Sequence, residues 1–165
     1  MKILLLDDDP RELVKIKNFF ESEFDLILCE SLEDVQRVQL KDEIIGGFLD
    51  LHLGGDEHGG LKALQFLKQK FPKSLFNMLS YSEDEAEIFQ CLEAGAFSFL
   101  SKPLSSEIAQ QYTNHLLINI GHDDFKEWVG ETLQSKECLH EILQASKSDV
   151  PVFISRSNKW LINKI

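Results

Sequence analysis

The chain has 165 residues, 43% of them hydrophobic, which is enough for one globular domain with a full core plus an appendage. Its formal net charge of −11 repels phosphate backbones, so we expect no direct binding to nucleic acid. No apolar run reaches the roughly 20 residues of a membrane span. The three widely spaced cysteines indicate a reducing cytoplasm and argue against a disulfide framework or a zinc site.

Strand-like and helix-like segments alternate through residues 1–120, which is typical of parallel βα units. Short apolar runs between loop-forming residues predict strands at residues 2–6, 25–29, 44–50, 75–80 and 97–101. Capping residues and helical spacing predict helices starting at Pro10, after Ser31, near Leu61, at Ser82 and at Ser105. We expect the second helix to reach about Leu40, the fourth to be closed by Gly95 and the fifth to reach Ile118.

The first and third predicted strands both end in carboxylates. Leu6 is followed by Asp7 and Asp8, and the run from Ile44 ends at Asp50. If the two strands are neighbours in one parallel sheet, these acids meet at the edge where open α/β sheets bind ligands. Three carboxylates in one pocket repel each other unless a positive charge joins them. A hard divalent cation with oxygen ligands, Mg²⁺, is the expected partner.

The remaining two strand ends add a hydroxyl and an ammonium group, from Ser80 and Lys102. Order and spacing of the whole set resemble the signature of the receiver domain of two-component response regulators, over about residues 1–120. The resemblance rests on Asp7-Asp8, Asp50, Ser80 and Lys102-Pro103. It implies an α/β fold with a doubly wound five-stranded parallel sheet, flavodoxin-like or CheY-like, in which the strands follow the order 2-1-3-4-5.

The resemblance also implies roles for the acidic residues. Asp50 is the expected phosphoacceptor, receiving a phosphoryl group from a sensor histidine kinase or a phosphotransfer protein. Asp7, Asp8, Asp50 and the backbone carbonyl of His52 are the expected Mg²⁺ ligands. Phosphoryl transfer of this kind depends mainly on positioning and charge neutralisation. The chain is therefore expected to assist its own phosphorylation and dephosphorylation and not to act as an enzyme on other molecules.

Three further residues are expected to sense the phosphoryl group and pass the signal on. Lys102 is expected to pair with Asp50 and then with phosphoryl oxygens, and a cis Lys102–Pro103 bond aims it into the pocket. Ser80 is expected to donate a hydrogen bond to a phosphoryl oxygen. Phe99 occupies the aromatic switch position of the family, which follows the hydroxyl inward.

The expected output surface consists of the fourth helix, the fifth strand and the fifth helix. It is predicted to form a homodimer or to bind a protein partner in signal transduction or transcriptional control. Tyr112 and Leu116 lie on the apolar stripe of the fifth helix and are candidate contacts, although such a stripe more commonly packs inside its own domain.

Residues 121–165 form a predicted small helical extension that resembles the opening of the AAA+ domain of NtrC-type, σ54-dependent activators. The resemblance rests on residues 128–131, a helical segment at 135–146 and the run 148–154. In that family a glycine-rich phosphate loop follows, because bare backbone N–H groups must wrap the phosphates. Here residues 155–160 contain Lys159 but no glycine, so we expect no ATPase.

A second hypothesis is a phosphorylation-independent pseudo-receiver that acts as an interaction or inhibitory module. Gly54 and Gly55 follow Asp50 where the family usually has a proline, which loosens the loop that carries the expected carbonyl ligand. Tyr81 follows Ser80 where the family usually has a small residue, and its bulk narrows the predicted path of a phosphodonor.

Overall fold

The computed structural model describes residues 1–119, 153–154 and 160–161. In the C-terminal extension it describes two short antiparallel strands, β6 (Phe153–Ile154) and β7 (Trp160–Leu161). The predicted domain boundary at residue 120, the helical segment at 135–146 and Lys159 lie outside the described residues.

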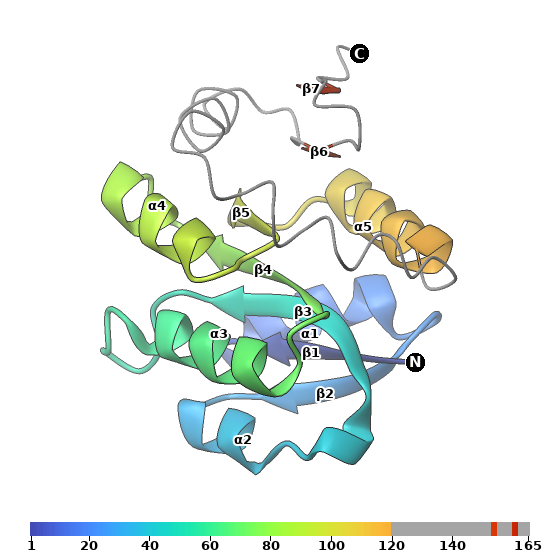
Figure 1. The fold of residues 1–165 in the computed structure, drawn as a ribbon, viewed down its shortest axis with the longest axis horizontal. Helices are drawn as coiled ribbons and strands as arrows, with labels where there is room; N and C mark the ends of the chain where they lie inside the picture. Colours follow the sequence, from blue (N-terminus) through green and yellow to red (C-terminus); the bar gives the residue numbers. More distant parts are fainter. Residues whose placement is uncertain (120–152, 155–159, 162–165) are drawn as a thin grey trace.

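Five parallel strands form the central sheet, in the spatial order β2-β1-β3-β4-β5 (Figure 1). They are β1 (Lys2–Leu6), β2 (Asp25–Cys29), β3 (Ile44–Asp50), β4 (Leu75–Ser80) and β5 (Ser98–Ser101). All four neighbouring pairs are parallel, as short strands separated by crossover helices require. The predicted fold class and strand order are confirmed.

Helices cover both faces of this sheet (Figure 1). They are α1 (Pro10–Phe20), α2 (Leu32–Arg37), α3 (Gly59–Lys70), α4 (Glu85–Glu93) and α5 (Ser106–Asn119). One core layer joins the sheet to α1 and α5, and the other joins it to α2, α3 and α4. Because successive strand side chains point to opposite faces, Ile3 and Leu5 enter the first layer while Leu4 and Leu6 enter the second.

The apolar stripe of α5 is part of the core. Tyr112 and Leu116 are each only 3% exposed, and the Tyr112 hydroxyl donates a hydrogen bond to the carbonyl oxygen of Leu75 at 2.6 Å. Its ring lies edge-on to Phe48, with 4.8 Å between the ring centroids. These two residues therefore pack within the domain, and neither is available as a dimer contact.

Two predicted helix boundaries were wrong. Helix α4 begins at Glu85, because Asp84 is its N-cap and accepts a hydrogen bond from the Ala86 N–H at 2.7 Å. Ser82 instead caps the turn before it and accepts from the Asp84 N–H. Helix α2 ends at Arg37, since Val38 is extended, and a separate 3₁₀ turn, η1 (Leu40–Asp42), leads into β3.

Strand β3 has no room for a side chain at Gly47, where it lies against β1. A Cβ atom there would collide with the backbone oxygen of Leu4 on β1, and the N and C atoms of Leu4 also lie within 3 Å. Relief would require the two strands to separate, since the obstacle is backbone and cannot rotate away. Gly47 therefore holds together the two strands that deliver the carboxylates.

We predict that Gly47→Ala lowers the free energy of unfolding by about 3 kcal/mol or prevents folding, because strands β1 and β3 can no longer pair at this point. The matched control is Gly55→Ala. Gly55 has a φ of 85° but no atom within 4 Å of an added Cβ, so its substitution should cost only about 1–2 kcal/mol. Urea unfolding of both variants tests the ranking, and equal losses would contradict it.

Candidate functional site

Three carboxylates meet where β1 and β3 end. The two strands pair with Leu6 opposite Leu49, so Asp7 and Asp50 follow side by side. One oxygen from each of Asp7, Asp8 and Asp50 can be chosen so that all three lie within 4.8 Å of one another. Asp7 is 1% exposed and Asp50 is 7% exposed, whereas Asp8 faces solvent. The acids that the sequence predicted to converge do so.

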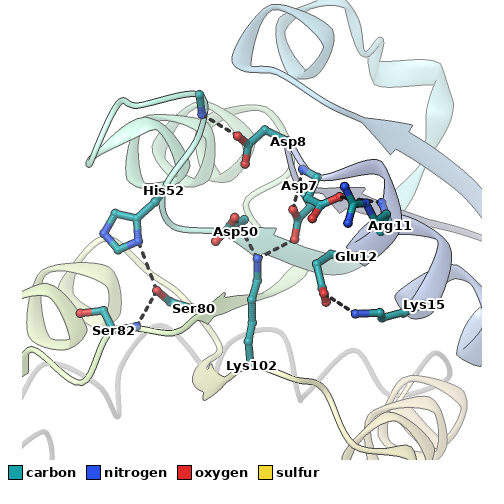
Figure 2. A network of polar contacts seen from close by, with 12 residues as sticks. Asp7, Asp8, Arg11, Glu12, Lys15, Asp50, His52, Ser80, Ser82 and Lys102 are labelled. Atoms are coloured by element: carbon teal, nitrogen blue, oxygen red, sulfur yellow. Dashed lines mark hydrogen bonds and ion pairs between the residues drawn. The ribbon is translucent and has the colours of Figure 1, made fainter.

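Lys102 reaches this cluster from the end of β5. Its side chain is 4% exposed, and its Nζ lies 2.7 Å from Asp7 Oδ2 and 2.9 Å from Asp50 Oδ2 (Figure 2). The Lys102–Pro103 peptide bond is cis, as predicted. With all groups ionised, three carboxylates and one ammonium leave two negative charges uncompensated, which matches the charge of a divalent cation.

The pKa values of the buried pair reflect two opposing effects. Burial raises the pKa of the Asp50 carboxyl, the Lys102 ammonium opposes that rise, and the negative charge of Asp7 adds to it. For Lys102, burial lowers the pKa, but hydrogen bonds to Asp7 and Asp50 and their charges together outweigh burial and raise it. The ammonium is therefore held charged while Asp50 gains proton affinity.

The oxygens of the cluster fit a hard divalent cation. Asp7 Oδ1 accepts a hydrogen bond from the Asp9 N–H at 3.0 Å, and Asp8 Oδ2 accepts one from the Gly54 N–H at 3.0 Å. The exposed side of Asp8 keeps the cluster open to water, as suits an ion that retains part of its hydration shell. The donor set consists only of oxygens, which favours Mg²⁺ over a transition metal.

The glycine pair after β3 has a structural reason. Gly54 and Gly55 have φ values of 56° and 85°, a region that residues with a Cβ rarely adopt. They form the turn that brings Leu53 and Asp56 into a bridge and turns the Gly54 N–H toward Asp8. The two glycines therefore form a turn whose backbone contacts Asp8 at the edge of the carboxylate cluster.

Ser80 lies at the end of β4, fully buried, one residue beyond the Leu79 that pairs with Asp50. Its hydroxyl accepts a hydrogen bond from the Ser82 N–H at 3.1 Å and lies 3.4 Å from His52 Nδ1 (Figure 2). The opposite nitrogen of this ring, Nε2, lies 3.3 Å from Glu87 Oε1 on α4. From the sequence we expected only the backbone carbonyl of His52 to take part in the site, and we expected no role for Glu87.

Two predicted residues lie at the margin of the cluster. The Tyr81 ring is 68% exposed, and Lys102 Nζ lies 5.6 Å from its centroid, a cation–π arrangement. Phe99 on β5 is partly buried and packs against the core layer that contains α4. Tyr81 therefore stands beside the only ammonium of the cluster, and Phe99 connects β5 to the layer beneath α4.

A family comparison agrees with this geometry. Residues 3–113 match the model of the response regulator receiver domain. The chain belongs to the response regulator receiver domain family. The predicted resemblance to that family is confirmed, and a carboxylate cluster able to hold a metal ion lies at the carboxyl edge of its sheet.

Two curated relatives and one solved structure resemble this receiver chain. A cyclic di-GMP phosphodiesterase of Thermotoga maritima is 26% identical over 120 residues, which cover 72% of this chain and 32% of the relative. The response regulator protein PilR of Pseudomonas aeruginosa is 24% identical over 162 residues, covering 93% and 36%. The chain thus spans about a third of the length of these relatives.

The solved structure is the beryllofluoride-activated receiver domain dimer of NtrC4. It is 18% identical to this chain and has a TM-score of 0.63. The match covers 72% of this chain and 97% of the NtrC4 receiver, which shows a shared receiver fold. Among the described residues, no helix is both long enough and apolar enough to cross a bilayer.

The pKa of Asp50 predicts how the stability of this receiver chain depends on pH. A folded-state pKa above the unfolded value means that the folded state binds the proton more tightly. Without metal, the contribution of Asp50 to stability should therefore fall as pH rises from about 3.8 through its raised pKa. Burial lowers the pKa of His115, which adds an opposite slope below pH 6.5, so the Asp50 contribution is the difference between the wild type and Asp50→Asn. Asp50→Asn should remove that fall and be more stable than the wild type at pH 7 by roughly 1 kcal/mol.

Lys102→Met is the opposing variant for this measurement. It leaves Asp7 and Asp50 buried without a cation, so we expect a loss of about 3 kcal/mol at pH 7 that shrinks as pH falls and the carboxylates protonate. Urea unfolding from pH 4 to 7 in a chelator tests both variants. A stability gain of Asp50→Asn over the wild type that does not grow as pH rises through this window would contradict the electrostatic description, as would a Lys102→Met variant as stable as the wild type at pH 7.

Proposed function

We propose that this chain is a phosphorylation-switched receiver in which Asp50 accepts a phosphoryl group from a sensor histidine kinase or a phosphotransfer protein. The observation that carries the proposal is the convergence of Asp7, Asp8 and Asp50 with an ammonium 2.9 Å from the Asp50 carboxylate. Structural ion pairs are usually built from one acid and one base. Here two acids share Lys102 and a third stands beside them, an arrangement that favours binding of a divalent cation.

In the proposed reaction, an oxygen of the Asp50 carboxylate attacks the phosphorus of a phosphohistidine. The P–N bond breaks, the imidazole nitrogen leaves with the bonding electron pair, and an acyl phosphate forms on Asp50. Lys102 moves its hydrogen bond from the carboxylate to a phosphoryl oxygen and offsets the added charge. Positioning and charge neutralisation are the main demands of such a transfer, and both are met by groups already in place.

Mg²⁺ is the proposed cofactor. Oxygens of Asp7, Asp8 and Asp50 and the backbone carbonyl of His52 would hold it. When bound, it neutralises negative charge on the phosphoryl oxygens and on the carboxylates. The Asp9 and Gly54 N–H groups keep one oxygen each of Asp7 and Asp8 oriented within this set.

The proposed output is a change of the surface formed by α4, β5 and α5. Ser80 and Phe99 are the proposed switch residues, because Ser80 is buried beside Asp50 and Phe99 packs against the layer under α4. This surface binds a second copy or another protein in the proposal. The dimer of the NtrC4 receiver supports self-association, and Leu117, 43% exposed on α5, is an apolar residue available for it.

A phosphorylation-independent pseudo-receiver is the second candidate. Two observations favour it: the turn at Gly54 already occupies one oxygen of Asp8, and the Tyr81 ring stands beside Lys102 at the rim of the cluster. In this case the receiver would bind its partner through the same fold without chemistry at Asp50.

The two candidates predict different responses to a small phosphodonor. With acetyl phosphate and Mg²⁺, the phosphorylation-switched receiver gains the mass of one phosphoryl group, and Asp50→Asn gains none. Mg²⁺ alone should raise the free energy of unfolding of the wild type, by about 2.7 kcal/mol at 100 times its dissociation constant. The rise should be smaller in Asp50→Asn, because the neutral amide oxygen of Asn binds Mg²⁺ less strongly than a carboxylate.

Asp25→Asn is the matched control, since Asp25 is 78% exposed and lies at the start of β2, opposite Lys2, at the other end of the strands from the cluster. It should be labelled and stabilised like the wild type. Unlabelled wild type together with unchanged partner binding by Asp50→Asn would favour the pseudo-receiver and overturn the first candidate. Intact-mass spectrometry and thermal unfolding provide the two readouts.

A further inference from the structure

The ring of His52 links the buried switch hydroxyl to α4, and the proposed chemistry does not use this link. His52 Nδ1 lies 3.4 Å from Ser80 Oγ, and His52 Nε2 lies 3.3 Å from Glu87 Oε1. Figure 2 shows the His52 ring beside Ser80, across the cluster from Asp7. A single side chain therefore spans the distance from the end of β4 to the first turn of α4.

The direction of each hydrogen bond follows from the groups available. Glu87 offers carboxylate oxygens, so it accepts and His52 Nε2 carries the hydrogen. Nδ1 of the neutral ring is then an acceptor, and the Ser80 hydroxyl donates to it. Ser80 Oγ in turn accepts from the Ser82 N–H at 3.1 Å. The chain of donors runs in one direction, from the Ser82 backbone through Ser80 and His52 to Glu87.

Ser80 has one hydroxyl hydrogen, and that fact creates a competition. A hydroxyl donates one hydrogen bond at a time, so Ser80 cannot donate to a phosphoryl oxygen on Asp50 and to His52 together. Both contacts of the His52 ring are near the long end of the hydrogen-bond range, so the link breaks at small cost. The ring of His52 and the phosphoryl group thus compete for the same hydrogen.

Glu87 depends on this ring. Its second carboxylate oxygen, Oε2, is buried and has no hydrogen-bond partner among the described residues. Burying one carboxylate oxygen unpaired is unfavourable, so the contact of Oε1 with His52 is what holds the side chain inward. When the ring loses Ser80, the contact that positions Glu87, and with it the first turns of α4, weakens.

We propose that His52 is a positioning residue that couples the Ser80 hydroxyl to α4 through Glu87, so that phosphorylation at Asp50 releases α4 by taking the Ser80 hydrogen away from the ring. The proposal rests on the proposed phosphorylation of Asp50. It assigns the transmission of the signal to a side chain on the loop after β3, and it adds a route to α4 that runs through His52.

The test uses beryllofluoride with Mg²⁺ as a stable phosphoryl mimic on the full chain. Fluorine NMR measures its binding, and amide hydrogen exchange with mass spectrometry reports on α4. In the wild type, binding should speed exchange in α4. In His52→Ala, α4 should already exchange faster without the mimic and respond little to it, and the mimic should bind about two- to fivefold tighter because Ser80 is no longer held.

Glu87→Ala separates the two halves of the link. Ser80 still meets His52 in this variant, so the affinity for the mimic should stay within about twofold of the wild type, while the response of α4 is lost. Glu93→Ala is the matched control, an exposed acid at the far end of the same helix, and it should behave as the wild type in both measurements.

The outcomes distinguish this inference from the proposed function beneath it. A wild type that does not bind the mimic overturns both. A wild type that binds it, with α4 of His52→Ala and Glu87→Ala responding as in the wild type, overturns only the His52 link. Tighter binding in His52→Ala with loss of the α4 response in both variants supports it.

Discussion

The shared hydrogen bonds of Lys102 to Asp7 and Asp50 are the contact on which this receiver depends. Two acids that end adjacent strands come close enough to repel, and both are largely removed from water. The buried Lys102 ammonium at the end of β5 reduces the repulsion between these two carboxylates. Its single charge does not also neutralise Asp8. The carboxyl edge of the sheet therefore carries more carboxylate charge than Lys102 neutralises, which is a deficit of positive charge. A divalent cation held by Asp7, Asp8 and Asp50 would offset that deficit.

The strand pattern made most of the fold and the polar cluster predictable. Apolar runs ending at Leu6, at Asp50 and before Lys102 fix which residues lie at the carboxyl edge, because parallel strands share one direction. Helix boundaries were less predictable. Ser82 to Glu85 has the spacing of a capping box, yet Asp84 competes for the same role and wins by accepting from Ala86. Local signals of equal strength are settled by packing, which a sequence alone does not contain.

The contact of His52 with Ser80 and Glu87 could not be predicted for a related reason. Ser80 and Glu87 lie 28 and 35 positions from His52 along the chain, and their meeting depends on the direction of one loop and on one rotamer. Membership in the receiver family likewise does not name the output. The matched relatives include a phosphodiesterase and PilR, and this chain covers about a third of each. The chemistry of the cluster and the surface that reports it have to be argued separately.

The most direct test of this account is the chemical mapping of the phosphorylated residue. The protein is incubated with acetyl phosphate and Mg²⁺, treated with borohydride to reduce the acyl phosphate to an alcohol, and digested for peptide mass spectrometry. We predict reduction at Asp50 alone, with none at Asp7 or Asp8, because Asp50 lies 2.9 Å from Lys102 and beside the end of β4 that carries Ser80. Reduction at another carboxylate, or at none, would contradict the assignment of Asp50 as the phosphoacceptor.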